Sequence, residues 1–290
     1  MHQMNSVWRT FCKWVSIATT GSALIIGAPG MAQAQAAADD PNPGAITFSG
    51  GVDVPSVYMF RGILQESDPK FTMWPWADLG IALASGEGAV KSVAVNIGVW
   101  ESLHTGSAGT NGTSGHAHYE EDFYTTLNLG FGGGVGVGIT YMALTSPNFM
   151  FETVKEMQIK VTKAHKLNPY GFMAFELTDA SADGGVNKGS YLELGVGPTF
   201  ALGPKASLTI PVKLGMSLKD YYESSGVDHK FGWFDVGALV TIPLTGVATK
   251  FGSWNIHGGL DVMALGDTTK AINQGESSKV VALFGVGLAY

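Results

Sequence analysis

The chain has 290 residues and is poor in charge, since 14% of its residues are Asp, Glu, Lys or Arg and the net charge is −7. Soluble domains usually carry about 25% charged residues, so the composition indicates a surface that does not face water throughout. With 17 basic residues against 24 acidic ones and no basic stripe, it excludes a nucleic-acid-binding protein.

The first 36 residues have the organisation of a secretory signal peptide. Arg9 and Lys13 form a positive amino-terminal region, residues 15–29 are mostly apolar, and small residues suitable for cleavage follow them. The apolar run is too short to span a bilayer, which disfavours a membrane anchor. We expect residues 1–36 to be removed on export together with Cys12, the only cysteine, so that no disulfide holds the mature chain.

Residues 37–44 form a short polar linker, and from residue 45 to residue 290 the dominant signal is alternation of apolar and polar side chains. The segment 208–219, for example, is apolar at every even position and mostly polar at every odd one, which is the period of a strand. Twelve such segments begin near residues 46, 71, 92, 118, 135, 149, 168, 190, 207, 232, 254 and 279. No later apolar run is long enough for a membrane helix.

The connections between these segments alternate between shorter turns and long polar loops. The shorter turns lie at 85–91, 132–134, 163–168, 202–205 and 245–252, and the longer loops at 105–117, 179–188, 223–230 and 266–278. Short turns at one end and long loops at the other are typical of outer-membrane barrels. The pattern therefore predicts an all-β fold, a transmembrane antiparallel up-and-down β-barrel of about 12 strands. The alternative, a soluble β-protein, would carry more charge on its polar face.

The last segment ends the chain with an aromatic residue on its apolar face. Val280, Phe284 and Tyr290 share this face with three further apolar residues. A closing strand that ends in an outward aromatic residue resembles the signal by which outer-membrane proteins are recognised for insertion. We therefore expect export to the periplasm, insertion into the cell outer membrane through the barrel-assembly machinery, and outer-membrane lipid as the surrounding partner.

If the apolar faces point to lipid, the opposite faces line the lumen, and strand parity places ten acidic and four basic residues there. The candidates for a selectivity-determining lining are Arg61, Asp78, Glu120, Asp122, Glu152, Glu156, Lys160, Glu176, Glu193, Lys213, Lys219, Asp235 and Asp261, with Asp53 as the tenth acid, and the predicted lumen aromatics are Trp74, Trp76, Trp100 and Trp233. An acidic lining favours cations. The aromatic side chains either fill the interior or form a stacking track for a ring-shaped solute.

These features predict an outer-membrane porin-like channel for passive diffusion of small hydrophilic solutes, with a weak preference for cations. A barrel of about eight strands leaves room only for side chains, whereas about sixteen leave an aqueous channel. The alternative is therefore a non-conducting barrel that is structural or binds a ligand or partner through its extracellular loops. Paired charges in the lumen would favour this alternative. The sequence leaves open whether copies of the chain form a homo-oligomer.

No motif indicates an enzyme or a cofactor. The stretch 85–92 departs from a phosphate-binding loop at Val90, where glycine is required, and no G-x-S-x-G motif occurs. A lipid-hydrolysing barrel would need a Ser/His pair on its outer face, where strand parity places no histidine. We expect no catalytic residues, no cofactor and no bound metal. The nearest approach to a metal site is the group His104, His116 and His118, to which parity assigns the same inward face.

The stretch SVYMFRGILQ, residues 56–65, continues the first strand in this interpretation. Tyr58 and Phe60 then face lipid. Arg61 points into the lumen near its outer mouth, where it could stack on Trp74. The stretch resembles the first-strand motif S-x-Y-x-F-R-G-[IV]-x-Q of the TorF family of porins. Further stretches, at 96–104, 121–124, 141–148 and 251–259, resemble a related branch of proteobacterial outer-membrane proteins, so the resemblance spans most of the chain that follows the signal peptide. It implies the same barrel fold and location, supplies no catalytic residues, and says little about the solute.

Overall fold

Strands dominate the computed structural model of the protein, which describes residues 44–66, 71–106, 116–224 and 226–290. The expected signal peptide and nearly all of the expected linker lie outside these residues. The wall strands are β1 (Ile46–Pro55), β4 (Thr72–Ser85), β5 (Val90–His104), β6 (His118–Phe131), β7 (Val135–Thr145), β8 (Val154–Lys163), β9 (Tyr170–Glu176), β10 (Ser190–Val196) with β11 (Thr199–Ala201), β12 (Ser207–Thr209) with β13 (Val212–Lys219), β16 (Phe231–Pro243), β17 (Ser253–Leu265) and β18 (Ser278–Ala289).

The smaller elements lie in the connections. They are β2 (Met59–Phe60), β3 (Ile63–Leu64), β14 (Glu223–Ser224), β15 (Val227–Asp228), the 3-10 turns η1 (Gly132–Gly134) and η2 (Thr249–Phe251), and the short helix α3 (Asp267–Ile272). Among the residues that the structure describes, no helix is both long enough and apolar enough to cross a membrane.

The wall strands pair antiparallel with their neighbours in sequence, and the first strand pairs with the last. Asp53 of β1 lies opposite Trp74 of β4 on one side and opposite Gly285 of β18 on the other. This double pairing closes the sheet into a barrel without free edges, which are a liability in open sheets. The predicted barrel of twelve antiparallel strands is confirmed, with β10–β11 and β12–β13 each counted as one wall strand.

Two neighbouring wall strands are each interrupted by a proline. Pro198 separates β10 from β11, and Pro211 separates β12 from β13, because proline has no N–H to donate to a strand ladder. Their carbonyl groups still accept hydrogen bonds, from the backbone N–H of Ile210 at 3.0 Å and from that of Gly237 at 2.9 Å. The alternating segment 208–219 is therefore part of the wall, but its ladder is broken near its start.

The outer face of the wall is apolar, as strand parity predicts. Ile97, Leu260 and Phe284 are 50%, 56% and 55% exposed, whereas Val281 and Leu283, which point the opposite way along β18, are 0% and 5% exposed. An outward apolar band around a closed barrel is the surface that a bilayer would cover. The predicted outward placement of Val280 and Phe284 is thus confirmed.

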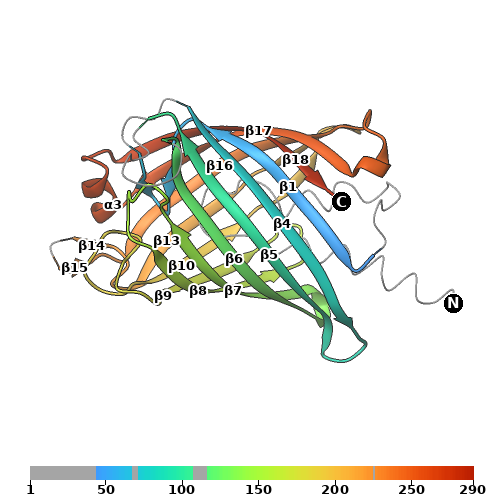
Figure 1. Ribbon diagram of the computed structural model, residues 1–290, viewed down its shortest axis with the longest axis horizontal. Helices are drawn as coiled ribbons and strands as arrows, with labels where there is room; N and C mark the ends of the chain where they lie inside the picture. Colours follow the sequence, from blue (N-terminus) through green and yellow to red (C-terminus); the bar gives the residue numbers. More distant parts are fainter. Residues whose placement is uncertain (1–43, 67–70, 107–115, 225) are drawn as a thin grey trace.

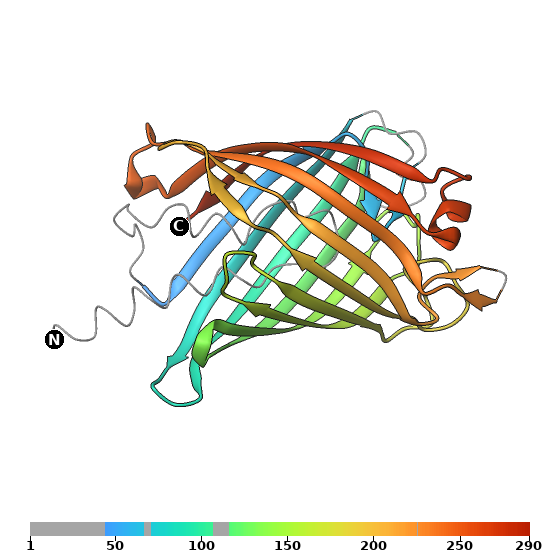
Figure 2. The same cartoon turned by 180° about the vertical axis from the view of Figure 1, so that it is seen from behind.

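The two ends of the barrel differ in the length of their connections. The helix α3 and the β14–β15 hairpin project from one end, and the carboxyl terminus lies at the other (Figure 1). The view from behind shows the same separation, with tilted strands between the two ends (Figure 2). The end that carries α3 is called the long-loop end below.

A charge at the middle of the outer face should destabilise the barrel in a bilayer. We expect Ile97→Arg to lower the free energy of unfolding by about 2–4 kcal/mol, because the outward guanidinium would enter hydrocarbon. The measurement is reversible denaturant unfolding in phospholipid vesicles. Val186→Arg, at a loop position that is 85% exposed, is the control and should change stability by less than about 0.5 kcal/mol. Equal effects of both variants would contradict a membrane-facing wall.

Candidate functional site in the barrel lumen

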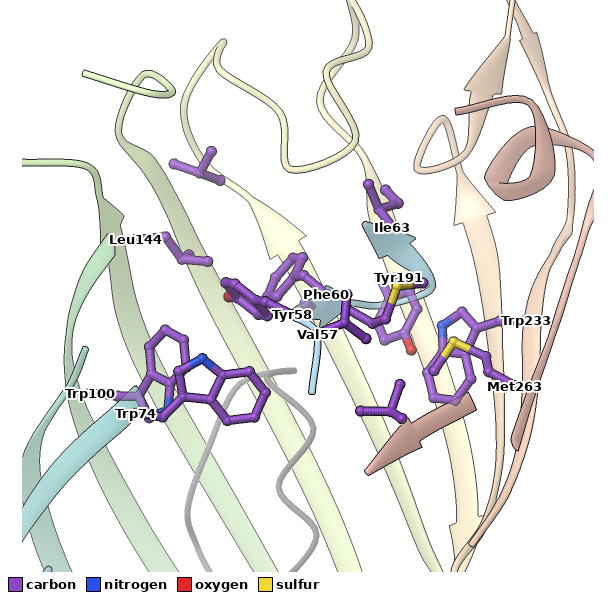
Figure 3. Close-up of a cluster of buried hydrophobic side chains, with 14 of the residues drawn as sticks. Val57, Tyr58, Phe60, Ile63, Trp74, Trp100, Leu144, Tyr191, Trp233 and Met263 are labelled. Carbon is purple, nitrogen blue, oxygen red and sulfur yellow. The ribbon is translucent and has the colours of Figure 1, made fainter. Parts of the chain in front are cut away.

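The connection that follows β1 folds into the lumen instead of extending the wall. The strand ends at Pro55, and residues 56–66, called the inward segment here, cross the interior of the barrel. Figure 3 shows Val57, Tyr58 and Phe60 of this segment between opposite walls; they are 5%, 1% and 5% exposed. The expectation that Tyr58 and Phe60 face lipid is therefore wrong.

The local sequence explains why the strand stops. Residues 57–60 are apolar at every position, and such a run needs burial on both sides. It forms the small hairpin β2–β3, in which Met59 lies opposite Leu64. The two turn residues, Arg61 and Gly62, have φ values of 47° and 82°, which a two-residue type I′ hairpin requires. A Cβ at Gly62 would meet the ring of Trp233 at 2.7 Å, so the turn is also tightly packed.

Arg61 at the tip of this hairpin forms a two-pronged ion pair with Glu156 of β8. Its two terminal nitrogens donate to the two carboxylate oxygens at 2.7 and 2.8 Å. The guanidinium also donates to the hydroxyl of Tyr221 at 2.6 Å and lies 4.5 Å from the ring centroid of Tyr191. Aromatic stacking of the arginine is thus present, but on Tyr191 and not on the predicted Trp74.

This ion pair spans the lumen. Along the wall, β8 follows β1 through β4, β5, β6 and β7, so Glu156 is five strands away in a barrel of twelve. Both side chains of the pair are fully buried. Burial lowers the pKa of the Arg61 guanidinium, but the Glu156 carboxylate together with Tyr221 and Tyr191 raises it, so the pKa lies well above its usual range and the arginine stays charged.

Further hydrogen bonds fix the backbone of the hairpin from the long-loop end. The hydroxyl of Tyr222 donates to the Arg61 carbonyl at 2.8 Å. Asn273, just after α3, donates to the Gly62 carbonyl at 2.7 Å and accepts from the Leu64 N–H at 2.8 Å. These bonds satisfy backbone groups of a hairpin that is not part of the wall ladder.

The end of the inward segment is held by a histidine network on β5. Glu66 lies 2.5 Å from Nδ1 of His104, and the Nε2 of that ring lies 2.5 Å from the hydroxyl of Ser102. The His104 ring also stacks on Tyr119 at 4.5 Å, and the Tyr119 hydroxyl donates to the Gln65 carbonyl at 2.8 Å. The imidazole therefore fastens the inward segment to the wall and is enclosed by it.

The predicted histidine group His104, His116 and His118 is not formed. His104 is buried inside the barrel, and His116 is exposed in a loop. His118 lies opposite Leu103, because a register shift between Ser102 and Leu103 leaves Tyr119 as an extra residue in β6. This β-bulge turns His118 to the outer face. The expectation that no histidine points outward from a strand is wrong for the same reason.

The predicted lumen aromatics do lie inside, but most pack on the inward segment. The Tyr58 ring centroid is 5.2 Å from that of Trp74 and 5.4 Å from that of Trp100, and Trp233 packs beside Gly62. Trp76 is half-buried against the same cluster. At these positions the aromatic side chains fill the interior and leave no continuous face for stacking a solute.

Between the inward segment and the end of the barrel opposite the long loops, one side of the wall carries a group of five charged residues, called the charge cluster here. Its members are Lys160, Glu193, Lys213, Asp235 and Asp261. Lys213 pairs with Asp235 at 3.0 Å, and the ammonium of Lys160 lies 4.9 Å from the Tyr170 ring centroid. Two tyrosine hydroxyls donate to Glu193, at 2.6 and 2.8 Å. The cluster thus contains three acidic and two basic side chains.

The other predicted acids inside the barrel are bound by neutral donors or buried along the wall. Asp78 accepts hydrogen bonds from Asn96 and from Tyr124. Glu176 accepts the backbone N–H groups of Ala182 and Gly189, both at 2.6 Å. Glu120 and Asp122, neighbours on the inward face of β6, are 2% and 4% exposed.

Two of the predicted lining residues are not in the lumen. Glu152 is exposed, because β8 begins at Val154 and not near residue 149. The side chain of Lys219, at the end of β13, is 75% exposed beside Asp220. Their removal leaves nine acidic and three basic residues of the predicted set inside, so the excess of acid over base remains.

Strand parity could not identify the loop residues that hold the inward segment. Glu66, Tyr221, Tyr222 and Asn273 all come from connections, where parity carries no information. One signal was present: two adjacent tyrosines, 221 and 222, stand in an otherwise polar stretch. Both are fully buried, and burial raises the pKa of each hydroxyl well above its usual range, so both are hydrogen-bond donors at neutral pH.

Comparisons with known proteins find similar barrels of low sequence identity. An outer membrane channel from Pseudomonas putida F1 is 9% identical, with a TM-score of 0.46 over 87% of this chain and 98% of that one. Outer membrane phospholipase A from Escherichia coli is 10% identical, with a TM-score of 0.46 over 84% and 92%. The NanC porin is 10% identical, with a TM-score of 0.40 over 84% and 99%. The sequence matches no protein-family model and no curated protein.

The ion pair between Arg61 and Glu156 should show strong coupling in a double-mutant cycle. We expect Arg61→Leu or Glu156→Leu alone to lower the free energy of unfolding by about 3–5 kcal/mol, because each leaves an uncompensated buried charge. The double variant should lose far less than the sum. Denaturant unfolding followed by tryptophan fluorescence measures all four proteins.

The pair Lys230–Asp228, at 2.6 Å with a lysine side chain that is 66% exposed, provides the control for this cycle. Lys230→Leu should cost no more than about 1 kcal/mol, because water screens the exposed ammonium group. Additive effects of Arg61→Leu and Glu156→Leu would show that the two side chains do not pair across the lumen.

Proposed function

We propose that the protein is an outer-membrane channel for small hydrophilic solutes, narrowed at its long-loop end by the inward segment. The observation that carries this proposal is a closed wall of twelve strands with an apolar outer face and a charged, hydrogen-bonding interior. Membrane barrels that enclose a water-filled channel have a polar interior of this kind. The signal peptide at residues 1–36, recognition of the strand ending at Tyr290 by the barrel-assembly machinery, and kinship with TorF porins belong to the same proposal.

The proposed channel prefers cations weakly. Nine acidic residues of the predicted lining against three basic ones support this preference, because fixed carboxylates in a low-dielectric wall lower the energy of a passing cation. The preference is weak because two of the three basic residues, Arg61 and Lys213, each neutralise a carboxylate. In the charge cluster, replacing one acidic side chain by a neutral one leaves equal numbers of acidic and basic groups.

A second candidate function, a non-conducting barrel, is favoured by the inward segment itself. The segment crosses the lumen, and its Arg61 forms a buried ion pair with the opposite wall. A barrel closed in this way would act through its long loops, as a structural protein or as a binder of a ligand or partner. The two candidates differ in one measurable property, the conductance of the purified protein.

Substitution in the charge cluster should change ion preference if the lumen conducts. We expect Glu193→Gln to lower the cation-to-anion permeability ratio at least about two-fold, because a unit charge about 10 Å away contributes about 0.4–1.7 kcal/mol. Reversal potentials in planar bilayers under a salt gradient provide the measurement. Glu152→Gln, which removes an exposed loop charge, is the matched control and should leave the ratio unchanged. An anion-preferring wild-type channel would contradict the proposed selectivity.

Loss of the cross-lumen ion pair should raise conductance. We expect Arg61→Ala to increase the single-channel conductance or the open time relative to the wild-type protein, because the hairpin tip loses its anchor to Glu156. Lys230→Ala, which removes a cation from an exposed ion pair, should have no such effect. If neither the wild-type protein nor Arg61→Ala conducts after verified insertion, the non-conducting alternative is correct.

A further inference from the structure

Three residues at the long-loop end of the wall bring metal-binding atoms together on the outer face. Glu101 of β5 and His118 and Glu121 of β6 each offer one ligand atom, and these three atoms all lie within 4.8 Å of one another. All three residues are half-buried. They are separate from the lumen residues discussed above, because Trp100, Ser102 and Glu120 occupy the inward positions between them.

The β-bulge in β6 creates this group. Glu101 lies directly opposite Glu121, and Leu103 lies opposite His118, so the extra residue Tyr119 brings His118 onto the same face as both carboxylates. In a regular ladder, His118 would share the inward face of Glu120. The one inserted residue thus moves His118 to the outer face, where it joins Glu101 and Glu121.

The placement of the two carboxylates is unfavourable without a cation. Like charges directly opposite each other on neighbouring strands destabilise a sheet. Among the described residues, neither Glu101 nor Glu121 forms an ion pair with a lysine or arginine. One step further along the wall, the outward pair is Val99 and Phe123, and Phe123 is 49% exposed. The carboxylates therefore border the apolar band, where negative charge is costly.

From this geometry we infer that Glu101, His118 and Glu121 form a binding site for a divalent transition-metal ion of the Zn²⁺ class. One imidazole nitrogen and two carboxylate oxygens are a ligand set that suits Zn²⁺, whose bonds to both atom types are about 2.0–2.2 Å. Such bonds place two ligand atoms at most about 4.4 Å apart, so small rotations of the side chains close the group around an ion.

The ligand set also distinguishes between ions. Ca²⁺ prefers about six to eight oxygen ligands, and the site supplies two carboxylates and one nitrogen. Imidazole suits Zn²⁺, Cu²⁺ and Ni²⁺ better than it suits Ca²⁺ or Mg²⁺. The site should therefore bind Zn²⁺ in preference to Ca²⁺ by at least about ten-fold.

Titration calorimetry of the refolded full-length barrel with ZnCl₂ tests the site. We expect His118→Gln to weaken Zn²⁺ binding at least about ten-fold, because it removes the only nitrogen ligand. Glu121→Gln should weaken it as well. His116→Gln, which changes an exposed loop histidine close in sequence, is the matched control and should bind Zn²⁺ like the wild-type protein.

A stability measurement separates loss of the site from loss of the fold. Without metal, Glu101→Gln should be at least as stable as the wild-type protein, because it removes the repulsion from Glu121. With Zn²⁺, the wild-type midpoint of unfolding should rise and that of Glu101→Gln should not.

Three results would overturn the inference. They are the absence of Zn²⁺ binding by the wild-type protein, unchanged binding by His118→Gln and Glu121→Gln, and loss of binding in His116→Gln alone. Tighter binding of Ca²⁺ than of Zn²⁺ would overturn the assignment of the metal class.

Discussion

The ion pair between Arg61 and Glu156 determines how the interior of this barrel is arranged. A buried guanidinium is costly unless it lies beside a carboxylate and is hydrogen-bonded, and Arg61 has both Glu156 and the Tyr221 hydroxyl as partners. The pair draws the first connection of the chain across the lumen. Because the tip is fixed there, Val57, Tyr58 and Phe60 are brought against wall tryptophans and tyrosines inside the barrel.

The rest of the lumen depends on a different balance. Away from the inward segment, carboxylates are held by neutral donors, as with Asp78 beside Asn96 and Glu193 beside two tyrosines. Neutral donors satisfy the oxygen atoms without adding positive charge, and the amino groups of the charge cluster lie near Glu193 and Asp235. The barrel thus combines a hairpin held by a neutralised ion pair at its long-loop end with an interior that holds more acidic than basic residues.

Alternation of side chains was sufficient to predict the wall, but not the segment that fills it. The strand period fixes which residues face outward, so Val280 and Phe284 could be placed correctly from sequence alone. The same rule misplaced Tyr58 and Phe60 in residues 56–66. These two side chains alternate as in a wall strand, but Val57 and Met59 between them are equally apolar, so the alternation does not identify an outer face. His118 was misplaced for another reason. The bulge at Tyr119 reverses which face the preceding residues of β6 point to. Partners such as Glu156 for Arg61 depend on tertiary placement, which no local pattern encodes.

The sequence separation of the contacts around the inward segment has a consequence for the order of folding. Wall strands pair mainly with their neighbours in sequence, whereas Arg61 reaches Glu156 across 95 positions, Tyr222 across 161, and Gly62 reaches Asn273 across 211. Contacts between distant parts of a chain form late, because loop closure must precede them. The hairpin tip therefore acquires its full set of partners only after β8, the 220–230 connection and α3 are in place. The pairing of β1 with β18, such as Asp53 with Gly285, is at least as distant in sequence, so by the same reasoning closure of the wall and docking of the hairpin are both late steps.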